Sequence, residues 1–501
     1  MLPFLHFKKN IDSLLAAAVG FYIIFLFTRH GGIGIEPDSI VYFTAAENLH
    51  THGIFTDFMN RPVVDFPAFY PFFLSGILLF TGLKPILFAP VTNALMFALV
   101  IYLSGCIMEC FSFRSKCYKI AVLTGIVLSP CLLEVYSMLW SETLFILLLL
   151  LFMMALCSYY RSHSKKVLII AALIAALASV TRYAGITIIA TGGLLILLDM
   201  QLHIRKKITD LLLFSLISVS LLVINLARNY AISKTMTGNR EKSITTLSKN
   251  LYDSGSVLHD WFPVLHSHNS GAGLLAVFAL IGLAWICLGP YTRNHRLTTY
   301  EDIAAVFSVI YILFIVTMAS ISRFESLNSR LFTPVFIPLV WIGSSQIVLL
   351  YRNTNKIKKK WVAVLCAIGF FCFLYCELAA DYETWDGVKD AGIPGYTEDP
   401  WRYSETVQFI QKDSLPFQQG YTIYSNAIDA LYFFTKKAGK FLPHKEINLE
   451  VQDFINDHRC YVVMFSDGDN PDLVGVDFIV NTKKMKLLKQ FSDGAIYGVD
   501  K

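Results

Sequence analysis

The chain has 501 residues, of which 55% are hydrophobic, 14% aromatic and only 16% charged. Soluble domains carry about a quarter charged residues, so this composition excludes an ordinary soluble domain and predicts a membrane protein. The net charge of +5 is small for this length and implies no nucleic-acid partner, because basic residues gather at span ends in any multi-pass protein.

The apolar runs predict eleven transmembrane helices, since about 20 residues cross a bilayer as a helix. These spans are 11–29, 86–109, 119–134, 142–160, 166–181, 184–200, 209–228, 272–289, 303–321, 331–351 and 361–379. The first is expected to be retained, because a basic flank and an apolar core are followed by no small-residue cleavage site. The ten cysteines lie mostly inside apolar runs, without a CxxC pair or a Cys/His cluster. We therefore expect neither a structural zinc site nor a disulfide framework. We also predict that the protein uses no cofactor.

A further apolar segment, 67–83, is long enough to raise the question of a twelfth span. If it does not cross, the basic clusters at the span ends fall on one side of the membrane, as the positive-inside rule requires. The clusters are Lys8/Lys9, Arg114/Lys116/Lys119, Arg161/Lys165/Lys166, Arg205/Lys206/Lys207, Arg293/Arg296, and Arg352 with Lys356 to Lys360. We therefore predict that 67–83 lies in the outer membrane surface, beside a second short helix over 38–52.

This topology predicts a polytopic α-helical domain over 1–379 and an extracytoplasmic α/β domain over 380–501. Two long loops of the helical domain, 30–85 and 229–271, then lie on the outer face. In the tail, "YTIYSN" and "CYVVMFS" have the pattern of buried strands, and "AIDALYFFTKKAG" that of a helix closed by Gly439. "KLLKQFSDGAIYGVD" predicts a hairpin turned at Asp493-Gly494.

Charged residues at the outer span ends are the candidates for chemistry, because charges are costly near lipid. Asp38, after Pro37, is either the N-cap of the 38–52 helix or a working acid. Glu142 begins the span 142–160, where a carboxylate also favours the helix dipole. Arg182, between two closely spaced spans, and Arg330, at the start of a Pro-containing span, either anchor lipid headgroups or bind a lipid-linked phosphate.

Asp65 and Tyr70, in "RPVVDFPAFYPFF", either set the turn into the interfacial segment or contact substrate. Together the candidates place two carboxylates and two arginines on the outer face. A carboxylate can deprotonate an acceptor hydroxyl while arginines hold a departing phosphate.

The order of "EPDSIVYFTAAENL", "FPAFYPFFLSGILLFTG", "SMLWSETLFILLLLL", "SVTRYAGITIIATGGLLIL" and "SRLFTPVFIPLVWIG" resembles that of GT-C membrane glycosyltransferases. Within that class it is similar to the polyprenyl-phosphate-sugar-dependent group, which includes protein mannosyltransferases and lipid A aminoarabinose transferases. The resemblance covers roughly 1–350, and the tail resembles the extracytoplasmic domain of many members.

The resemblance implies an inverting hexosyl- or pentosyltransferase of the plasma (inner) membrane, with its site on the extracytoplasmic side. Asp38 matches the family's general base, and Ser39 stands where a second acid often follows. Glu142 matches a catalytic acid of the second outer loop. Arg182 and Arg330 match donor-phosphate residues, and Asp65 and Tyr70 lie in the segment that corresponds to a substrate-binding motif. The donor would be a polyprenyl-phosphate-linked sugar, the acceptor a lipid, glycan or protein, and no metal would be needed.

Three other interpretations remain open from the sequence, of which one is an inactive relative that serves as an assembly partner, since Ser39 replaces the second acid. An outer-face polymerase or ligase of undecaprenyl-pyrophosphate-linked glycans would use a late loop, here 229–271 with Arg228, Arg240, Lys242 and Lys249. A non-enzymatic lipid or glycan transporter would carry polar groups at mid-span, and the spans 142–160 and 166–181 are nearly free of them.

Overall fold

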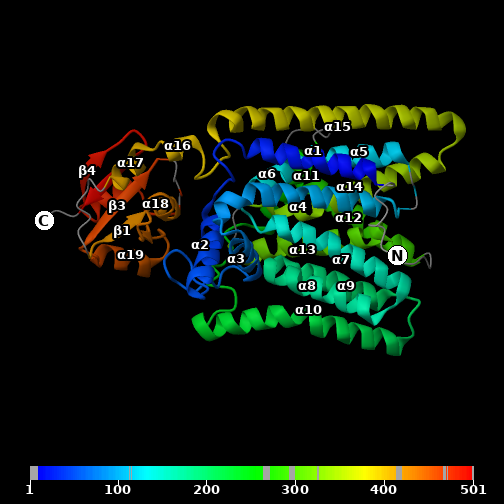
Figure 1. The fold of residues 1–501 in the computed structure, drawn as a ribbon, viewed down its shortest axis with the longest axis horizontal. Helices are drawn as coiled ribbons and strands as arrows, with labels where there is room; N and C mark the ends of the chain where they lie inside the picture. The colour runs from blue at the N-terminus through cyan, green and yellow to red at the C-terminus, as the bar shows by residue number, and fades with distance from the viewer. Residues whose placement is uncertain are drawn as a thin grey trace.

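A bundle of long helices continues into a small α/β domain at one end (Figure 1). The structure is a computed structural model that describes residues 10–498 except 112, 114, 263–270, 293–298, 324–325, 413–419, 467–469 and 471. Of the basic clusters used to predict sidedness, Lys8, Lys9, Arg114, Arg293 and Arg296 therefore lie outside the described residues.

Each predicted span overlaps a helix or a pair of helices. These are α1 Ile11–Phe27, α4 Pro85–Met108, α5 Lys116–Val127 with α6 Pro130–Ser137, α7 Glu142–Ser162, α8 Lys165–Thr181, η3 Tyr183–Gly185 with α9 Ile186–Leu198, α10 Ile204–Ser233, α12 Ala272–Thr292, α13 Tyr300–Ile321, α14 Ser329–Asn353 and α15 Lys356–Ala391. Among the described residues, six helices are long and apolar enough to cross a membrane: α4, α7, α10, α13, α14 and α15. The bent pair α5 and α6 would make a seventh, and α1, α9 with η3, and α12 are shorter apolar helices. The fold is thus a multi-span membrane fold, with the count of eleven spans left as a prediction.

The predicted span 119–134 is broken where α5 ends and α6 begins, with an angle of 50° between the two helices. Pro130 is the first residue of α6. Proline lacks an N–H group and disfavours helical geometry at the residue before it, so a helix cannot run straight through this position.

Two short helices, α2 Pro37–His52 and α3 Phe69–Thr81, form the first loop as predicted. α2 ends at Gly53, which adopts the left-handed conformation with φ 68°. α3 has 13 residues, so at about 1.5 Å per residue it is far shorter than a bilayer core of about 30 Å. The surface position of 67–83 stays a prediction, since α9, which lies within a predicted span, also has 13 residues. The second long loop carries a helix of its own, α11 Leu247–Trp261.

The C-terminal domain contains a five-stranded mixed sheet in the order β2-β1-β3-β5-β4. Its elements are α16 Asp399–Arg402, α17 Glu405–Gln411, β1 Thr422–Ser425, α18 Ile428–Thr435, β2 Lys440–Phe441, α19 Asn448–Asn456, β3 Cys460–Phe465, α20 Val476–Asn481, β4 Lys486–Gln490 and β5 Gly494–Gly498. β1 is parallel to β2 and β3, whereas β5 is antiparallel to β3 and β4. Both predicted strands and the β4–β5 hairpin are confirmed.

The predicted end of the tail helix at Gly439 is wrong. α18 ends at Thr435, and Lys436 caps it in the left-handed conformation with φ 58°. Gly439 instead precedes β2, where a Cβ atom would lie 2.5 Å from the carbonyl oxygen of Ile423 in β1. The glycine therefore permits β2 to approach β1 rather than stopping the helix.

The C-terminal domain packs on the first loop of the helical bundle. The amide of Tyr396 donates to the carbonyl of Ile35 at 2.8 Å. From α18, the ring of Phe433 contacts Phe43 of α2, with centroids 6.1 Å apart. The domain is therefore fixed over the start of α2, at the same end of the bundle as the residues discussed below.

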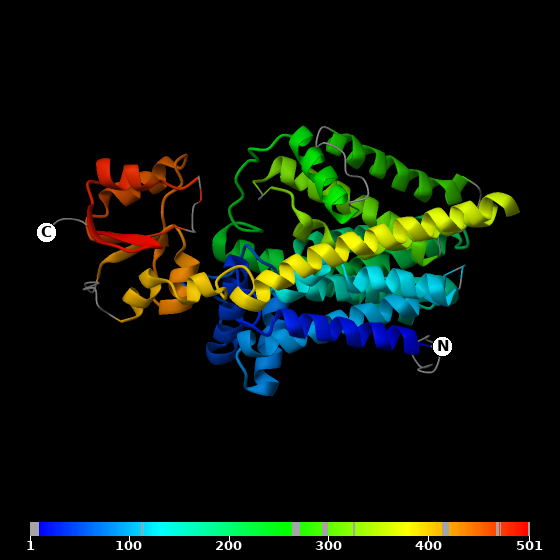
Figure 2. The same ribbon diagram turned by 90° about the horizontal axis from the view of Figure 1, so that it is seen from above.

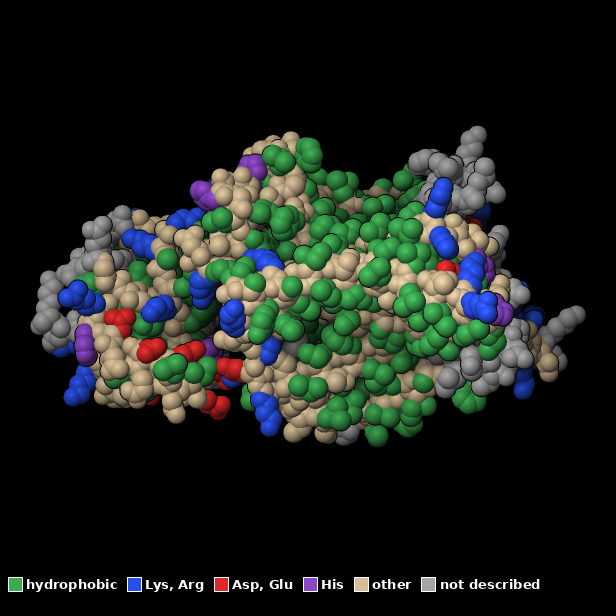
Figure 3. Space-filling view, turned by 90° about the horizontal axis from the view of Figure 1, so that it is seen from below, with side chains coloured by type: hydrophobic (Ala, Val, Ile, Leu, Met, Phe, Trp, Pro, Cys, Tyr) green, Lys and Arg blue, Asp and Glu red, His purple; other side chains and the backbone are tan. Residues whose placement is uncertain are grey.

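The exterior of the bundle is apolar. Figure 2 shows α15 running obliquely along the outside of the bundle to the C-terminal domain. Figure 3 shows hydrophobic side chains over the bundle, while charged side chains gather toward its two ends and on the C-terminal domain. This distribution suits contact with lipid around the middle of the helices.

Candidate active site

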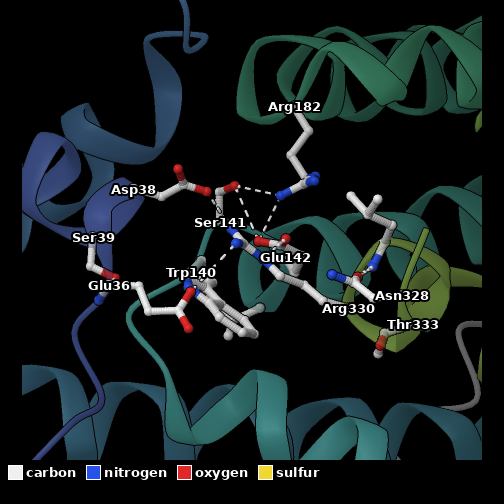
Figure 4. Close-up of polar contacts among 12 residues, drawn as sticks. Glu36, Asp38, Ser39, Trp140, Ser141, Glu142, Arg182, Asn328, Arg330 and Thr333 are labelled. Atoms are coloured by element: carbon white, nitrogen blue, oxygen red, sulfur yellow. Dashed lines mark hydrogen bonds and ion pairs between the residues drawn. The ribbon is translucent and has the colours of Figure 1, made fainter. Parts of the chain in front are cut away.

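Four predicted residues from four separate elements meet at the end of the bundle nearest the C-terminal domain (Figure 4). Asp38 lies in the first turn of α2 and Glu142 is the first residue of α7. Arg182 directly follows α8, and Arg330 lies in the first turn of α14. We call these four residues the ion-pair cluster.

Asp38 is not the cap of its helix, contrary to one of the two interpretations of the sequence. The N-cap is Glu36, which forms a reciprocal capping box with Ser39. The backbone amide of Glu36 donates to Ser39 Oγ at 3.2 Å. Because Ser39 satisfies the helix end, the side chain of Asp38 is free to point into the cluster, where it remains 32% exposed.

Glu142 joins the two arginines. Its Oε1 accepts from Arg330 Nε at 2.7 Å, and its Oε2 lies 2.6 Å from Arg182 Nη1. The Glu142 side chain is fully buried. A buried carboxylate is tolerated when opposite charges and hydrogen bonds compensate for its lost hydration, and here each oxygen has its own guanidinium. Glu142 therefore holds both arginines in place.

All three guanidinium nitrogens of Arg330 face carboxylate oxygens, and Nε bonds to Glu142 as described above. Its Nη2 donates to Asp38 Oδ2 at 2.5 Å, and its Nη1 lies 3.7 Å from Glu36 Oε2. The guanidinium also stacks on the indole of Trp140, 3.9 Å from the ring centroid. A forked, planar cation is required for this set of contacts, since an ammonium group is a single point charge.

Arg182 is held by a polar chain that the sequence did not reveal. Its Nη1 donates to Ser141 Oγ at 3.0 Å, and Ser141 Oγ lies 3.2 Å from the hydroxyl of Tyr42 in α2. Burial raises the pKa of the Tyr42 phenol above its ordinary value, and the nearby Asp38 charge adds to the effect. Tyr42 is therefore a neutral hydrogen-bonding group.

Trp140 and Ser141, which precede Glu142 in "WSE", were not predicted, because aromatic and hydroxyl side chains are common at the ends of membrane helices. Asn93 fixes the loop before them by donating to the carbonyls of Tyr136 at 3.0 Å and Met138 at 2.8 Å. A buried asparagine in the apolar span 86–109 was the signal that could have revealed this loop as an ordered one.

Among the described residues, neither Tyr70 nor Asp65 contacts Arg182 or Arg330 of the cluster. The ring of Tyr70 is buried and meets the ring of Tyr42 edge to face, with centroids 5.1 Å apart. Asp65 faces Gly238, where a Cβ atom would lie 1.5 Å from Asp65 Oδ1. Burial raises the pKa of Asp65, and the charge of Arg240 opposes that rise. Tyr70 thus packs on Tyr42, which belongs to the polar chain beside Arg182. Asp65 packs against the loop that follows α10.

Two of the four basic residues of the alternative late-loop site, Arg228 and Lys249, make contacts with nearby protein groups. Arg228 donates to the carbonyl of Val63 at 2.8 Å and stacks on Phe55, 4.7 Å from the ring centroid. Lys249 pairs with Asp253 at 2.6 Å, within α11. These two contacts are accounted for within the described part of the loop, and the late-loop alternative stays a prediction from the sequence.

A further acid, from the C-terminal domain, lies near enough to Asp38 for the two charges to interact. Asp429, in the first turn of α18, is buried, with 5% of its surface exposed. Burial raises the pKa of Asp429 to about 7, and the negative charge of Asp38 contributes to the rise. Asp429 was hidden in the sequence because only the packing of α18 on α2 brings it near Asp38.

The ion-pair cluster has two positive and two negative charges and is neutral as a unit. Both guanidinium groups are paired with carboxylates. Of the two carboxylates, Asp38 is the exposed one, so an anion that binds the cluster would compete with Asp38 for Arg330. The described residues hold no group of three or more His, Cys, Asp or Glu placed to bind a metal ion. The carboxylates of the cluster can accept a proton, and its guanidinium groups can bind an anion.

No protein-family model matches the sequence, and no curated protein matches it. Among solved structures, the chain is similar to ArnT from Cupriavidus metallidurans in the apo state. The TM-score is 0.56 at 11% identity, over 96% of this chain and 97% of that one. The same ArnT bound to undecaprenyl phosphate gives a TM-score of 0.53 at 12% identity, over 98% of each chain.

The arabinofuranosyltransferase AftD from Mycobacteria gives a TM-score of 0.50 at 14% identity. This chain is covered to 99% but spans only 40% of the AftD chain. At these identities the likeness concerns the fold, and the fold is that of the GT-C glycosyltransferases.

Proposed function

We propose that this chain is a membrane glycosyltransferase that moves a sugar from a polyprenyl-phosphate-linked donor to an acceptor hydroxyl. The observation that carries the proposal is the convergence of Asp38, Glu142, Arg182 and Arg330 at one end of a GT-C fold. The ArnT structure of the same fold was solved with undecaprenyl phosphate bound. That lipid has the phosphate and the polyprenyl chain that the proposed donor would share.

In the proposed reaction, Asp38 accepts the proton of the acceptor hydroxyl. The acceptor oxygen attacks the anomeric carbon of the donor sugar, and the bond between that carbon and the phosphate oxygen breaks. Polyprenyl phosphate leaves with the bonding electron pair, and the anomeric configuration inverts because attack and departure occur on opposite faces. Asp38 suits the role because it is the exposed acid of the cluster.

The two arginines would stabilise the phosphate as it gains negative charge. Arg330 is bound to Asp38 in this structure, at 2.5 Å. A donor phosphate that displaces this contact would bind Arg330 and release the Asp38 carboxylate at the same time. Donor binding would thereby activate the base.

Glu142 is proposed as a positioning residue instead of a catalytic one. It is fully buried, and each of its oxygens already has an arginine partner. It therefore acts through Arg182 and Arg330 by fixing their guanidinium groups where the phosphate arrives. Direct proton transfer to substrate would require an exposed oxygen.

The site and the C-terminal domain are proposed to lie on the extracytoplasmic side of the plasma (inner) membrane. The support is the positive-inside pattern of the loops, together with the position of both at the same end of the bundle. The acceptor would be a lipid, glycan or protein that approaches between the first loop and the C-terminal domain.

The test is transfer of sugar from extracted polyprenyl-phosphate donor in proteoliposomes. We expect Asp38→Asn to lower the rate by about 10²-fold or more, because general-base catalysis contributes about that factor. Glu47→Gln, on the same helix but outside the cluster, is the control and should keep the wild-type rate. Unchanged transfer by a normally folded Asp38→Asn variant would rule out Asp38 as the base.

A further inference from the structure

A cavity of about 390 Å³ adjoins the ion-pair cluster, among α1, α6, α14 and α15. Trp140 and Glu36 line the cavity and also contact Arg330 of the cluster. The Trp140 ring contacts the Arg330 guanidinium and also lines the cavity. Glu36 lines the cavity and lies 3.7 Å from Arg330. Whatever occupies this cavity would therefore sit beside the proposed reacting groups.

The cavity is acidic. Its described lining residues include five carboxylates and no Lys, Arg or His. The acids are Glu36, Glu134, Asp260, Glu377 and Asp381. Glu36 has Arg330 nearby, Asp260 lies 3.6 Å from His259 and is largely exposed, and Glu134 is exposed.

Glu377 and Asp381 differ from the other acids because they are buried without a cationic partner among the described residues. They lie one turn apart on α15 and are 3% and 9% exposed. Within the described part of the chain, Glu377 Oε2 and Asp381 Oδ2 have no hydrogen-bond partner, and both residues line the cavity. Residues four apart on a helix share a face, so these two acids act on the same part of the cavity.

Leaving two carboxyl groups buried and unpaired is costly, and a positively charged ligand would remove that cost. The rest of the lining suits an organic cation. Trp140 and Trp261 present aromatic surface, which attracts ammonium groups through the negative faces of the rings. A metal ion is a poorer fit, since the described residues hold no cluster of three or more metal-ligating side chains.

We propose that this cavity binds an ammonium group carried by a substrate, with Glu377 and Asp381 as its counter-charges and Trp140 and Trp261 as its aromatic walls. This inference rests on the proposed function, because only a glycosyltransferase activity makes the bound amine part of a substrate. The ammonium group belongs either to the sugar that is transferred or to the acceptor, and the chemistry of recognition is the same for both.

The test measures binding of small amines to the full-length protein in lipid nanodiscs. Glucosamine represents an amine on a sugar and phosphoethanolamine an amine on a headgroup, and each is compared with its N-acetylated form. We expect at least one amine to bind at least tenfold more tightly than its acetylated form, because acetylation removes the charge. The amine with the larger preference identifies the source. Equal binding of both amines and their acetylated forms would overturn the proposal.

Variants of α15 test the residues. Glu377→Gln combined with Asp381→Asn should abolish the preference for the amine, whereas Glu383→Gln, an exposed acid on the same helix, should leave it intact. The double variant should unfold at the wild-type temperature or above, because it removes buried unpaired charge. A double variant that folds normally and keeps the preference would contradict the assignment, and the single variants serve if it does not fold.

Binding is measured without turnover, so its failure is distinct from failure of the proposed function. Asp38→Asn should lose transfer and keep the amine preference. If transfer depends on Asp38 but the protein shows no amine preference, the glycosyltransferase proposal stands and the amine-binding proposal is rejected.

Discussion

Arg330 Nη2 donates to Asp38 Oδ2 at 2.5 Å, across 292 positions of the chain. The contact joins the first loop to the start of α14 and places the exposed acid of the cluster directly on its central cation. The same guanidinium reaches Glu142, at 2.7 Å, and stacks on Trp140. Arg330 is therefore the residue on which both the architecture of the site and the proposed chemistry depend.

Replacing Arg330 by lysine tests the need for a forked cation. Arg330→Lys keeps the charge but cannot contact Asp38 and Glu142 and stack on Trp140 together. We expect transfer to fall on the order of tenfold or more, with a smaller loss of thermal stability than in Arg330→Ala. Wild-type rates in Arg330→Lys would show that a point charge is sufficient.

Removing Glu142 should destabilise the protein. Glu142→Ala leaves Arg182 and Arg330 buried around an empty space, and breaking a buried pair costs about 3–5 kcal/mol. The measurement is thermal unfolding in detergent, with Glu383→Gln as the control on an exposed acid. If Glu142→Ala unfolds at the wild-type temperature, Glu142 does not hold the arginines.

Ser39 is expected to contribute to stability and not to catalysis. Its hydroxyl accepts from the amide of Glu36, so Ser39→Ala removes one half of the capping box. Loss of such a cap costs about 1 kcal/mol. A lower unfolding temperature with an unchanged transfer rate is the expected pair of results, and a large loss of transfer would place Ser39 in the reaction.

Asp429 makes stability depend on pH. Its pKa in the folded protein is about 7, above the value of about 3.9 of an unfolded aspartate. Between these values the folded state binds more protons than the unfolded state, so stability falls as pH rises from about 4 to about 7 and changes no further above that.

The variant Asp429→Asn should remove this part of the pH dependence. It should also raise the unfolding temperature at pH 8 relative to the wild-type chain, since no carboxylate is then buried near Asp38. Unfolding temperatures measured from pH 5 to pH 8 check both points. An unchanged slope in Asp429→Asn would mean that other groups cause the pH dependence.

The sequence predicted the helices well because each has a strong local signal. Apolar runs of about 20 residues marked the spans, and Gly53 correctly marked the end of α2. The bend at Pro130 and the end of α18 at Lys436 were not predicted, since each depends on how neighbouring segments pack. Gly439 illustrates the difficulty, because a glycine near a helix end can serve a strand contact instead.

The candidate site was predicted in part. Four charged side chains were identified because charge is rare at span ends and therefore informative. Trp140, Ser141 and Tyr42 were not, because aromatic and hydroxyl side chains are ordinary in membrane helices. Glu377 lies inside the predicted span 361–379 and Asp381 directly beyond it, and only the packing of α15 shows that both line a cavity.

Which residues are apolar enough for lipid, and which charges stand at the span ends, could be predicted from the order of residues along the chain. Which of those charges meet depends on how the helices pack. The tertiary structure gave the N-cap of α2 to Glu36 and Ser39, which left Asp38 free to bind Arg330. The physical reason is that helix formation depends on neighbours along the chain, whereas an ion pair depends on distances between segments that only packing brings together.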